Sequence, residues 1–314
     1  MMRSQDDGSR RPDAPSTARL AMHGIADRGD VDIVDAQIHL APQPGADGLL
    51  SAMDALGVRA AMLDELWGRN ELDHGIPCIE LGDGVYRPLS PLAQGAAVAH
   101  PRRFCFLQRV TRRDPALTGL VPMLAATPGC RALRIVMPDR RERELFAAGG
   151  YDALLSVAQA HGLPLCVLTR DAGLLLGEAA SRFPRLQFII DHCGWVRTSS
   201  QWDDVLALAG RDNTWLKWSH AHRAFGRMDA PADAATTAQA GAEQREFERA
   251  IAAFGAERVL WASDVTHEES SRTWAQLLAF VLCNPALSQS QREWVLAGTA
   301  RQVFRWPAGG GRLD

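Results

Sequence analysis

The chain has 314 residues, of which 46% are hydrophobic, so it is long enough to bury one large core. Its 34 basic and 37 acidic residues give a net charge of −3, which provides no field suited to binding nucleic acid or an anionic membrane. We therefore expect the partner to be a small molecule.

Composition predicts the extent of the folded domain and whether the chain has a membrane-spanning segment. Residues 1–30 are rich in Arg, Asp, Ser, Pro and Gly and lack the apolar run of a secretory signal, which predicts a flexible tail. We expect residues 31–306 to form the folded domain and residues 307–314 a short C-terminal tail. No segment approaches the roughly 18 uncharged apolar residues that a membrane span needs.

The cysteines indicate a reducing compartment. They are widely spaced and form no CxxC pair: Cys78, Cys105, Cys130, Cys166, Cys193 and Cys283. Small secreted folds use denser patterns of cysteine. We therefore expect free thiols and a cytoplasmic protein.

Short apolar runs alternate with longer helical patterns along the chain, which indicates a parallel sheet covered by helices. In chain order, the predicted strands are 31–38, 59–65, 104–110, 132–137, 164–169, 186–191, 214–219 and 258–263. Several of these runs are continuously apolar, as expected for strands that are buried on both faces.

Helical patterns cover residues 46–57, 151–162, 171–183 and 243–255, and three of these four end close to Gly or Pro. Eight β/α units fit an α/β fold of the (β/α)8 (TIM) barrel type better than the alternative, a doubly wound open sheet. We allow for a homodimer of such barrels.

Two inserts interrupt the regular spacing. Residues 67–94 follow the second strand and are dense in Gly, Pro and charged residues, which predicts a long loop over the C-terminal face, as a lid or an interface. Residues 220–244 follow the seventh strand on the same face, and their Ala, Thr and Asp content predicts a mobile segment.

Polar residues at the C-terminal ends of barrel strands point toward a shared pocket. This rule selects Gln37, His39, Glu65, Arg109, Arg134, Thr169, Arg170, Asp191, His192, Lys217, Ser219, Ser263 and Asp264. Any one of them could instead be a loop residue or a helix cap, and Glu65 in particular could cap a helix. Lys217 alternates with Trp215 and Trp218, so its stem could pack beneath a head group at the surface. The convergence of His39, His192 and Asp264 on one rim is the stronger signal for chemistry.

Five motifs resemble one known family, the second group of amidohydrolases, which includes pyrone-dicarboxylate lactonase, sugar lactonases and metal-dependent decarboxylases. The resemblance spans residues 31–306. Its motifs are IVDAQIH, AAVAHPRRFCFLQRV, LQFIIDHCG, FGAERVLWASD and GTARQVFRW, in that order along the chain. The family resemblance implies the same barrel fold.

The sequence departs from the family at two metal-ligand positions. Members usually carry His-x-His on the first strand, where this chain has Gln37-Ile38-His39, and many carry a His on the fifth, where this chain has Leu168. Amide oxygen is a weak ligand for zinc. We therefore expect no metal; if zinc or manganese were bound, its ligands would be His39, His192 and Asp264.

The resemblance implies a lactonase-like hydrolase of a small carboxylated cyclic ester. In this assignment Asp264 activates water, while His39 and His192 polarise the carbonyl. Arg109 or Arg134 would bind a substrate carboxylate, although each could equally form an ion pair at the rim. Gln37 and Lys217 are two further candidates for binding the substrate.

Two other functions stay open at this stage. One is a metal-dependent non-oxidative decarboxylase or other carbon–carbon lyase of the same superfamily. The other is a barrel that binds a ligand without catalysis.

Overall fold

The computed structural model of the chain describes residues 31–66, 77–226, 228–229, 241–266 and 272–306. Both predicted tails, residues 67–76 of the first insert and residues 230–240 of the second lie outside the described residues. In the described part of the chain, no helix has the length and apolar character needed to cross a bilayer.

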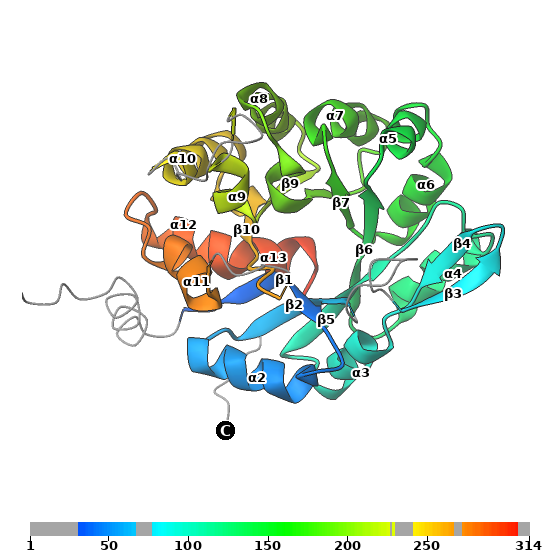
Figure 1. Cartoon of the computed structure of the whole chain (residues 1–314), viewed down its shortest axis with the longest axis horizontal. Helices are drawn as coiled ribbons and strands as arrows, with labels where there is room; N and C mark the ends of the chain where they lie inside the picture. The colour runs from blue at the N-terminus through cyan, green and yellow to red at the C-terminus, as the bar shows by residue number, and fades with distance from the viewer. Residues whose placement is uncertain (1–30, 67–76, 227, 230–240, 267–271, 307–314) are drawn as a thin grey trace, which may run out of the picture.

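Eight parallel strands form one nearly closed barrel, and their order in the sheet follows the order of the chain (Figure 1). The strands are β1 (Val34–Leu40), β2 (Ala60–Glu65), β5 (Phe104–Arg109), β6 (Cys130–Met137), β7 (Leu165–Thr169), β8 (Phe188–Ile190), β9 (Thr214–Trp218) and β10 (Val259–Trp261). All eight predicted strands are present, and every paired neighbour among them runs parallel. The prediction of a (β/α)8 barrel is confirmed.

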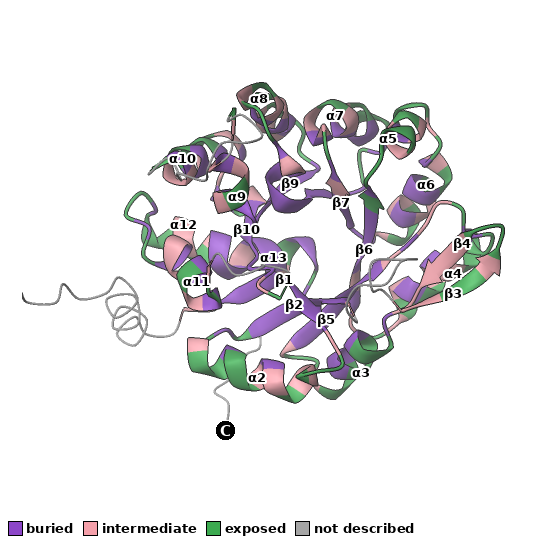
Figure 2. Cartoon of the chain, viewed as in Figure 1, coloured by how far each residue is buried: buried purple, intermediate pink, exposed green. Residues whose placement is uncertain are grey.

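Helices surround this barrel and turn their exposed faces outward, while the strands inside are mostly buried (Figure 2). The described helices are α2 (Gly45–Leu56), α3 (Pro91–Ala99), α4 (Leu117–Ala126), α5 (Arg140–Ala147), α6 (Asp152–His161), α7 (Ala172–Arg182), α8 (Ser199–Ala207), α9 (Ala221–Phe225), α10 (Ala242–Phe254), α11 (Trp274–Leu282), α12 (Gln289–Glu293) and α13 (Thr299–Val303). The four predicted helices correspond to α2, α6, α7 and α10.

The described part of the first insert, residues 77–94, contains regular structure where we predicted a long loop. It contains a hairpin of β3 (Cys78–Gly82) and β4 (Val85–Pro88), followed by the start of α3. Asp83 and Gly84 both have positive φ, 51° and 63°, as the tight turn of a hairpin requires.

The inside of the barrel changes from apolar to polar at one level. The lower inward positions form a single apolar cluster, which includes Val34, Ala36, Ala60, Met62, Cys105, Leu107, Ala132, Cys166, Ile189, Trp215, Leu260 and Ala262. Side chains alternate along a strand, so the next inward position is two residues later. At that level the strands, or the residues just after them, carry Asp64, Arg109, Arg134, Leu168, Asp191, Lys217 and Asp264.

An irregularity in β1 turns two polar side chains into this upper layer. The register of β1 against β2 shifts between Asp35 and Ile38, which is where a β-bulge would place an extra residue. Ala36 packs inside the barrel and Ile38 packs outside it, yet Gln37 contacts Lys217 of the interior. The bulge therefore allows Gln37 and His39 to face the mouth together.

Asp35 connects β1 to the segment that follows β10. One of its carboxylate oxygens accepts hydrogen bonds from the backbone N–H groups of Ser263, at 2.9 Å, and Gln37, at 3.2 Å. The other accepts one from the indole N–H of Trp274 at 2.9 Å. Burial raises the pKa of Asp35 to about 7, although the hydrogen bonds from Ser263 and Gln37 oppose that shift. This buried carboxyl group links β1, the segment after β10 and helix α11.

We expect Asp35→Asn to lower the free energy of unfolding by about 1–3 kcal/mol, because an amide presents N–H groups to donors that need an acceptor. Urea denaturation measures the change. Asp32→Asn is the matched control, since the ion pair of Asp32 with Arg301 is partly exposed and such pairs contribute about 0–1 kcal/mol. Equal destabilisation by the two variants would contradict the role given to Asp35.

Candidate active site and metal centre

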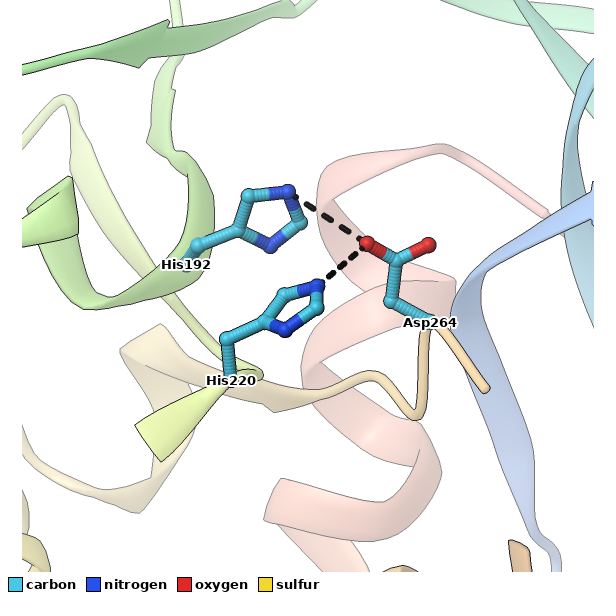
Figure 3. Close-up of side chains that lie close together, drawn as sticks. All are labelled: His192, His220 and Asp264. Atoms are coloured by element: carbon cyan, nitrogen blue, oxygen red, sulfur yellow. Dashed lines mark hydrogen bonds and ion pairs between the residues drawn. The ribbon is translucent and has the colours of Figure 1, made fainter. Parts of the chain in front are cut away.

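The carboxylate of Asp264, just after β10, is the centre of the site. Its Oδ1 lies 3.0 Å from Nε2 of His39, and its Oδ2 lies 2.8 Å from Nε2 of His220 and 3.5 Å from Nε2 of His192. Figure 3 shows the imidazoles of His192 and His220 directed at the same carboxylate oxygen. All four side chains are at most 5% exposed. The structure thus brings His39, His192 and Asp264 together and adds His220.

Three of these residues have a backbone in the left-handed region, which residues other than glycine rarely adopt. The φ angles of His192, His220 and Asp264 are 52°, 51° and 49°. Residues held in this region persist only where the surroundings enforce them, and they concentrate at functional sites. After β8 the turn continues through Gly194, where a Cβ would come 2.7 Å from the side chain of Val205. These turns aim the side chains at one point.

The hydrogen bonds of His192 fix its tautomer. Its Nε2 lies 3.2 Å from Nη2 of Arg134, and because guanidinium groups only donate, this Nε2 must carry a lone pair. Its Nδ1 lies 2.7 Å from Oγ of Ser219 and therefore carries the proton of the neutral ring. Burial is the largest effect that keeps the pKa of His192 well below its usual value. The ring has no N–H directed at Asp264, so the predicted role of polarising a carbonyl does not fit this geometry.

His39 is oriented in a similar way. Its Nδ1 lies 3.2 Å from the backbone carbonyl oxygen of Asp64, which can only accept, so Nδ1 donates. In the neutral ring this leaves a lone pair on Nε2, the atom that faces Oδ1 of Asp264. A lone pair beside a carboxylate oxygen is favourable only when a proton or a metal ion is shared between them.

Asp64 anchors a group of buried charges beneath His39. Arg109 donates two hydrogen bonds of 2.8 Å to its carboxylate, and Arg134 donates a third. Burial alone would raise the pKa of Asp64, but these cations outweigh it and hold the pKa well below its usual range. The neighbouring Glu65, which our sequence rule selected instead, points to the other side of β2, where it accepts a hydrogen bond of 2.8 Å from the backbone of Ala93 in helix α3. Its alternative interpretation as a helix cap is the one that the structure supports.

Asp191 connects a second pair of cations. Its Oδ2 accepts a hydrogen bond of 2.8 Å from Arg134, and its Oδ1 lies 2.6 Å from Nζ of Lys217. Burial alone would raise the pKa of Asp191, yet Lys217 and Arg134 together hold it at about 2. Lys217 also donates to Oε1 of Gln37 at 2.7 Å. These groups therefore form one continuous network of charged hydrogen bonds below the mouth.

These contacts bear on the four residues that we predicted to bind substrate. Arg109 and Arg134 both form ion pairs with carboxylates, as their alternative interpretation proposed, and the three guanidinium nitrogens of Arg134 each contact a protein group. Lys217 is fully buried, which rules out its alternative as a stem beneath a surface head group. Substrate binding by Arg109, Arg134, Gln37 and Lys217 stays a prediction.

The sequence analysis missed two members of the site. His220 follows the end of β9 just as His192 follows the end of β8, so the rule for strand ends would have included it. Asp64 was passed over for Glu65 because the run AAMLDE shows no alternation that sets which residues face inward.

Enzymes with a (β/α)8 barrel have their active sites at the C-terminal ends of the strands, which is where this carboxylate and its surrounding imidazoles lie. The family model of the amidohydrolases, Amidohydro_2, matches residues 91–306. The chain therefore belongs to the amidohydrolase family and is an enzyme of that superfamily. No curated protein matches the sequence.

Solved structures of similar fold cover nearly the whole barrel. An amidohydrolase from Burkholderia multivorans with bound zinc is 16% identical with a TM-score of 0.68, over 88% of this chain and 100% of that one. A probable 2-pyrone-4,6-dicarboxylic acid hydrolase from Acinetobacter baumannii with bound citric acid is 13% identical with a TM-score of 0.63, over 87% and 99%. A 5-carboxyvanillate decarboxylase from Novosphingobium aromaticivorans with manganese is 14% identical with a TM-score of 0.60, over 87% and 96%.

The expectation that no metal is bound was wrong. It rested on Gln37 and Leu168 as lost ligands and did not count His220. The structure places ligand atoms of His192, His220 and Asp264 all within 4.8 Å of one another, and structures of similar fold hold zinc or manganese. His220 is a candidate ligand that the expectation did not consider.

Proposed function

We propose that this enzyme is a metal-dependent hydrolase of a small carboxylated cyclic ester. The observation that carries the proposal is the ionic centre itself, a buried Asp264 carboxylate within 3.5 Å of three imidazole nitrogens. Structures of similar fold include both hydrolases and decarboxylases, so only the residues of this chain can favour one reaction over the other.

The donor set fits a divalent ion. Two imidazoles and one carboxylate are the ligands of catalytic zinc sites that keep a position open. The lone pair of His192 Nε2 faces Arg134 in this structure and would bind the ion in place of that contact, and burial keeps the ring neutral, which is the form that binds metals. His192, His220 and Asp264 would hold the ion, and when bound it would supply Lewis-acid polarisation of a substrate carbonyl.

Proton transfer falls to Asp264 and His39. The carboxylate is ionised, because burial raises its pKa less than the nearby imidazoles lower it, and the pKa lies well below its usual value. Its Oδ1 can accept a proton from an attacking water, and Nε2 of His39 lies 3.0 Å away, close enough to share that proton. Because the proton then resides on a side-chain pair, it is available for the leaving alcohol oxygen.

The charge of the network favours an anionic substrate. Three cations, Arg109, Arg134 and Lys217, balance three carboxylates, those of Asp64, Asp191 and Asp264. With neutral imidazoles the cluster is close to zero net charge, so a divalent ion would make it positive. A positive, buried site attracts a substrate carboxylate.

Decarboxylation is the second candidate, and the burial of the site favours it. The four central side chains are at most 5% exposed, so a substrate carboxylate that entered would lose most of its hydration. Loss of carbon dioxide removes that charge, whereas ester hydrolysis requires a water molecule beside Asp264.

One experiment distinguishes the two reactions. The metal-loaded enzyme is incubated with carboxylated lactones and carboxylated phenols in water enriched in oxygen-18, and the products are analysed by mass spectrometry. A hydrolase incorporates one solvent oxygen into the new acid and releases no carbon dioxide. Release of carbon dioxide without incorporation of oxygen-18 would contradict the proposal and establish the lyase.

Ser219 is expected to support metal binding without touching the ion, because it fixes the proton of His192 on Nδ1 through a contact of 2.7 Å. Ser219→Ala should weaken zinc binding by about 10- to 100-fold, as the loss of such a partner does in other metal sites. Competition with a chromophoric chelator measures the affinity. Ser181→Ala, in the exposed part of helix α7, is the control and should bind zinc as the wild type does. An unchanged affinity in Ser219→Ala would contradict the assigned tautomer.

A further inference from the structure

Lys217 is a fully buried cation whose surroundings resemble a metal-binding site. It lies on β9 at the first polar level inside the barrel and is 0% exposed. Its ammonium lies 2.6 Å from Oδ1 of Asp191, 2.7 Å from Oε1 of Gln37 and 3.7 Å from Sγ of Cys166. An amide oxygen from β1, a thiol from β7 and a carboxylate from the turn after β8 therefore converge on one positive charge.

This arrangement has consequences for a second divalent ion. Two-metal sites hold their ions close together, and a carboxylate can bind to both. Asp191 is a candidate for such a carboxylate because it directly precedes His192, one of the proposed ligands. However, both of its oxygens are bound by cations, one by Lys217 and the other by Arg134 at 2.8 Å. An additional divalent ion there would meet two positive charges in a medium of low dielectric constant.

We propose that the ammonium of Lys217 occupies a cation position inside the barrel and thereby restricts the enzyme to one divalent ion, at His192, His220 and Asp264. This inference rests on the proposed function, because it concerns the number of ions that the same site holds. The ammonium of Lys217 supplies the positive charge that a second metal ion would otherwise supply to Asp191 and Gln37.

Removal of the lysine side chain should leave a set of donor atoms that can bind a metal ion. Lys217→Ala leaves Asp191, Gln37 and Cys166 around a space without a positive charge, and carboxylate with sulfur is a donor set suited to cobalt or zinc. Burial raises the pKa of Cys166 to about 12, so its thiol is protonated in the wild type. On binding a metal ion the sulfur would release this proton to solvent and bind as a thiolate.

The test is cobalt binding by the full chain. Wild type, Lys217→Ala and Lys217→Arg are each saturated with cobalt(II), freed of excess metal by gel filtration, and analysed for cobalt per protein and for the near-ultraviolet sulfur-to-cobalt absorption. Arginine changes the side chain but keeps the positive charge, so it is the matched control. We expect one equivalent in the wild type and in Lys217→Arg, and two in Lys217→Ala with the absorption band. Adding Cys166→Ser to Lys217→Ala should abolish the band.

Each outcome decides the inference. A second equivalent in the wild type, or one equivalent without the band in folded Lys217→Ala, overturns it. If Lys217→Ala does not fold without metal, refolding with cobalt should recover it, because the ion replaces the missing charge; failure to recover also overturns the inference. A wild type that binds no cobalt contradicts the proposed function instead, so the two failures are distinguishable.

Discussion

Replacing Asp264 by asparagine is expected to lower kcat/KM by about 10²–10⁴-fold, the range that general acid–base groups contribute. The amide is nearly the same size but cannot accept the proton of water. It also removes the negative charge that lies 2.8 Å from His220 and 3.5 Å from His192, so the metal content should fall as well. Steady-state kinetics and elemental analysis of the purified variant measure both effects.

The control for this variant is Asp203→Asn. Asp203 is an exposed carboxylate that pairs with Arg249 on the surface, so its loss should leave kinetics and metal content unchanged. If Asp264→Asn kept wild-type turnover, Asp264 could not be the base, and the mechanism proposed here would be wrong.

The largest effect on stability is expected from Arg134→Met. The guanidinium is 2% exposed and is shared by Asp64, Asp191 and His192. Its removal leaves two carboxylates without one of their buried partners, and the loss of one member of a buried ion pair costs about 3–5 kcal/mol. We expect the free energy of unfolding in urea to fall by about that amount.

Arg112→Met provides the comparison for Arg134→Met. Arg112 forms a bidentate pair with Glu142 at 2.9 Å, but both side chains are more than 20% exposed. Pairs of this kind contribute about 0–1 kcal/mol. Similar losses of stability in the two variants would show that the buried ion pairs of Arg134 stabilise the fold no more than a surface pair does.

The barrel could be predicted from the sequence because its strands are buried on both faces and therefore appear as short, continuous apolar runs. The β3–β4 hairpin was missed although its turn, Asp83-Gly84, is a strong local signal, because the surrounding segment is polar. Local patterns thus identify elements whose burial is unambiguous and fail where a hairpin lies on the surface.

The site could be predicted only in part. His39, His192 and Asp264 were found because each follows a strand, and all three strands end at the same rim. The sequence did not show which residues of each strand face the interior, because a continuous apolar run has no alternation. Glu65 was therefore selected in place of Asp64. The pair formed by Arg134 and Asp64 joins residues 70 positions apart, and no local pattern reveals such a contact.

Dependence of catalysis on a bound metal ion is tested by a chelation experiment on the wild-type enzyme. Metal is removed with a chelator, activity on a substrate of the lactone and carboxylated-phenol panel is measured, and zinc or manganese is then returned in known amounts. We predict loss of turnover on removal and recovery that saturates at one equivalent of ion per chain. Full turnover by enzyme shown by elemental analysis to hold no metal would contradict the account.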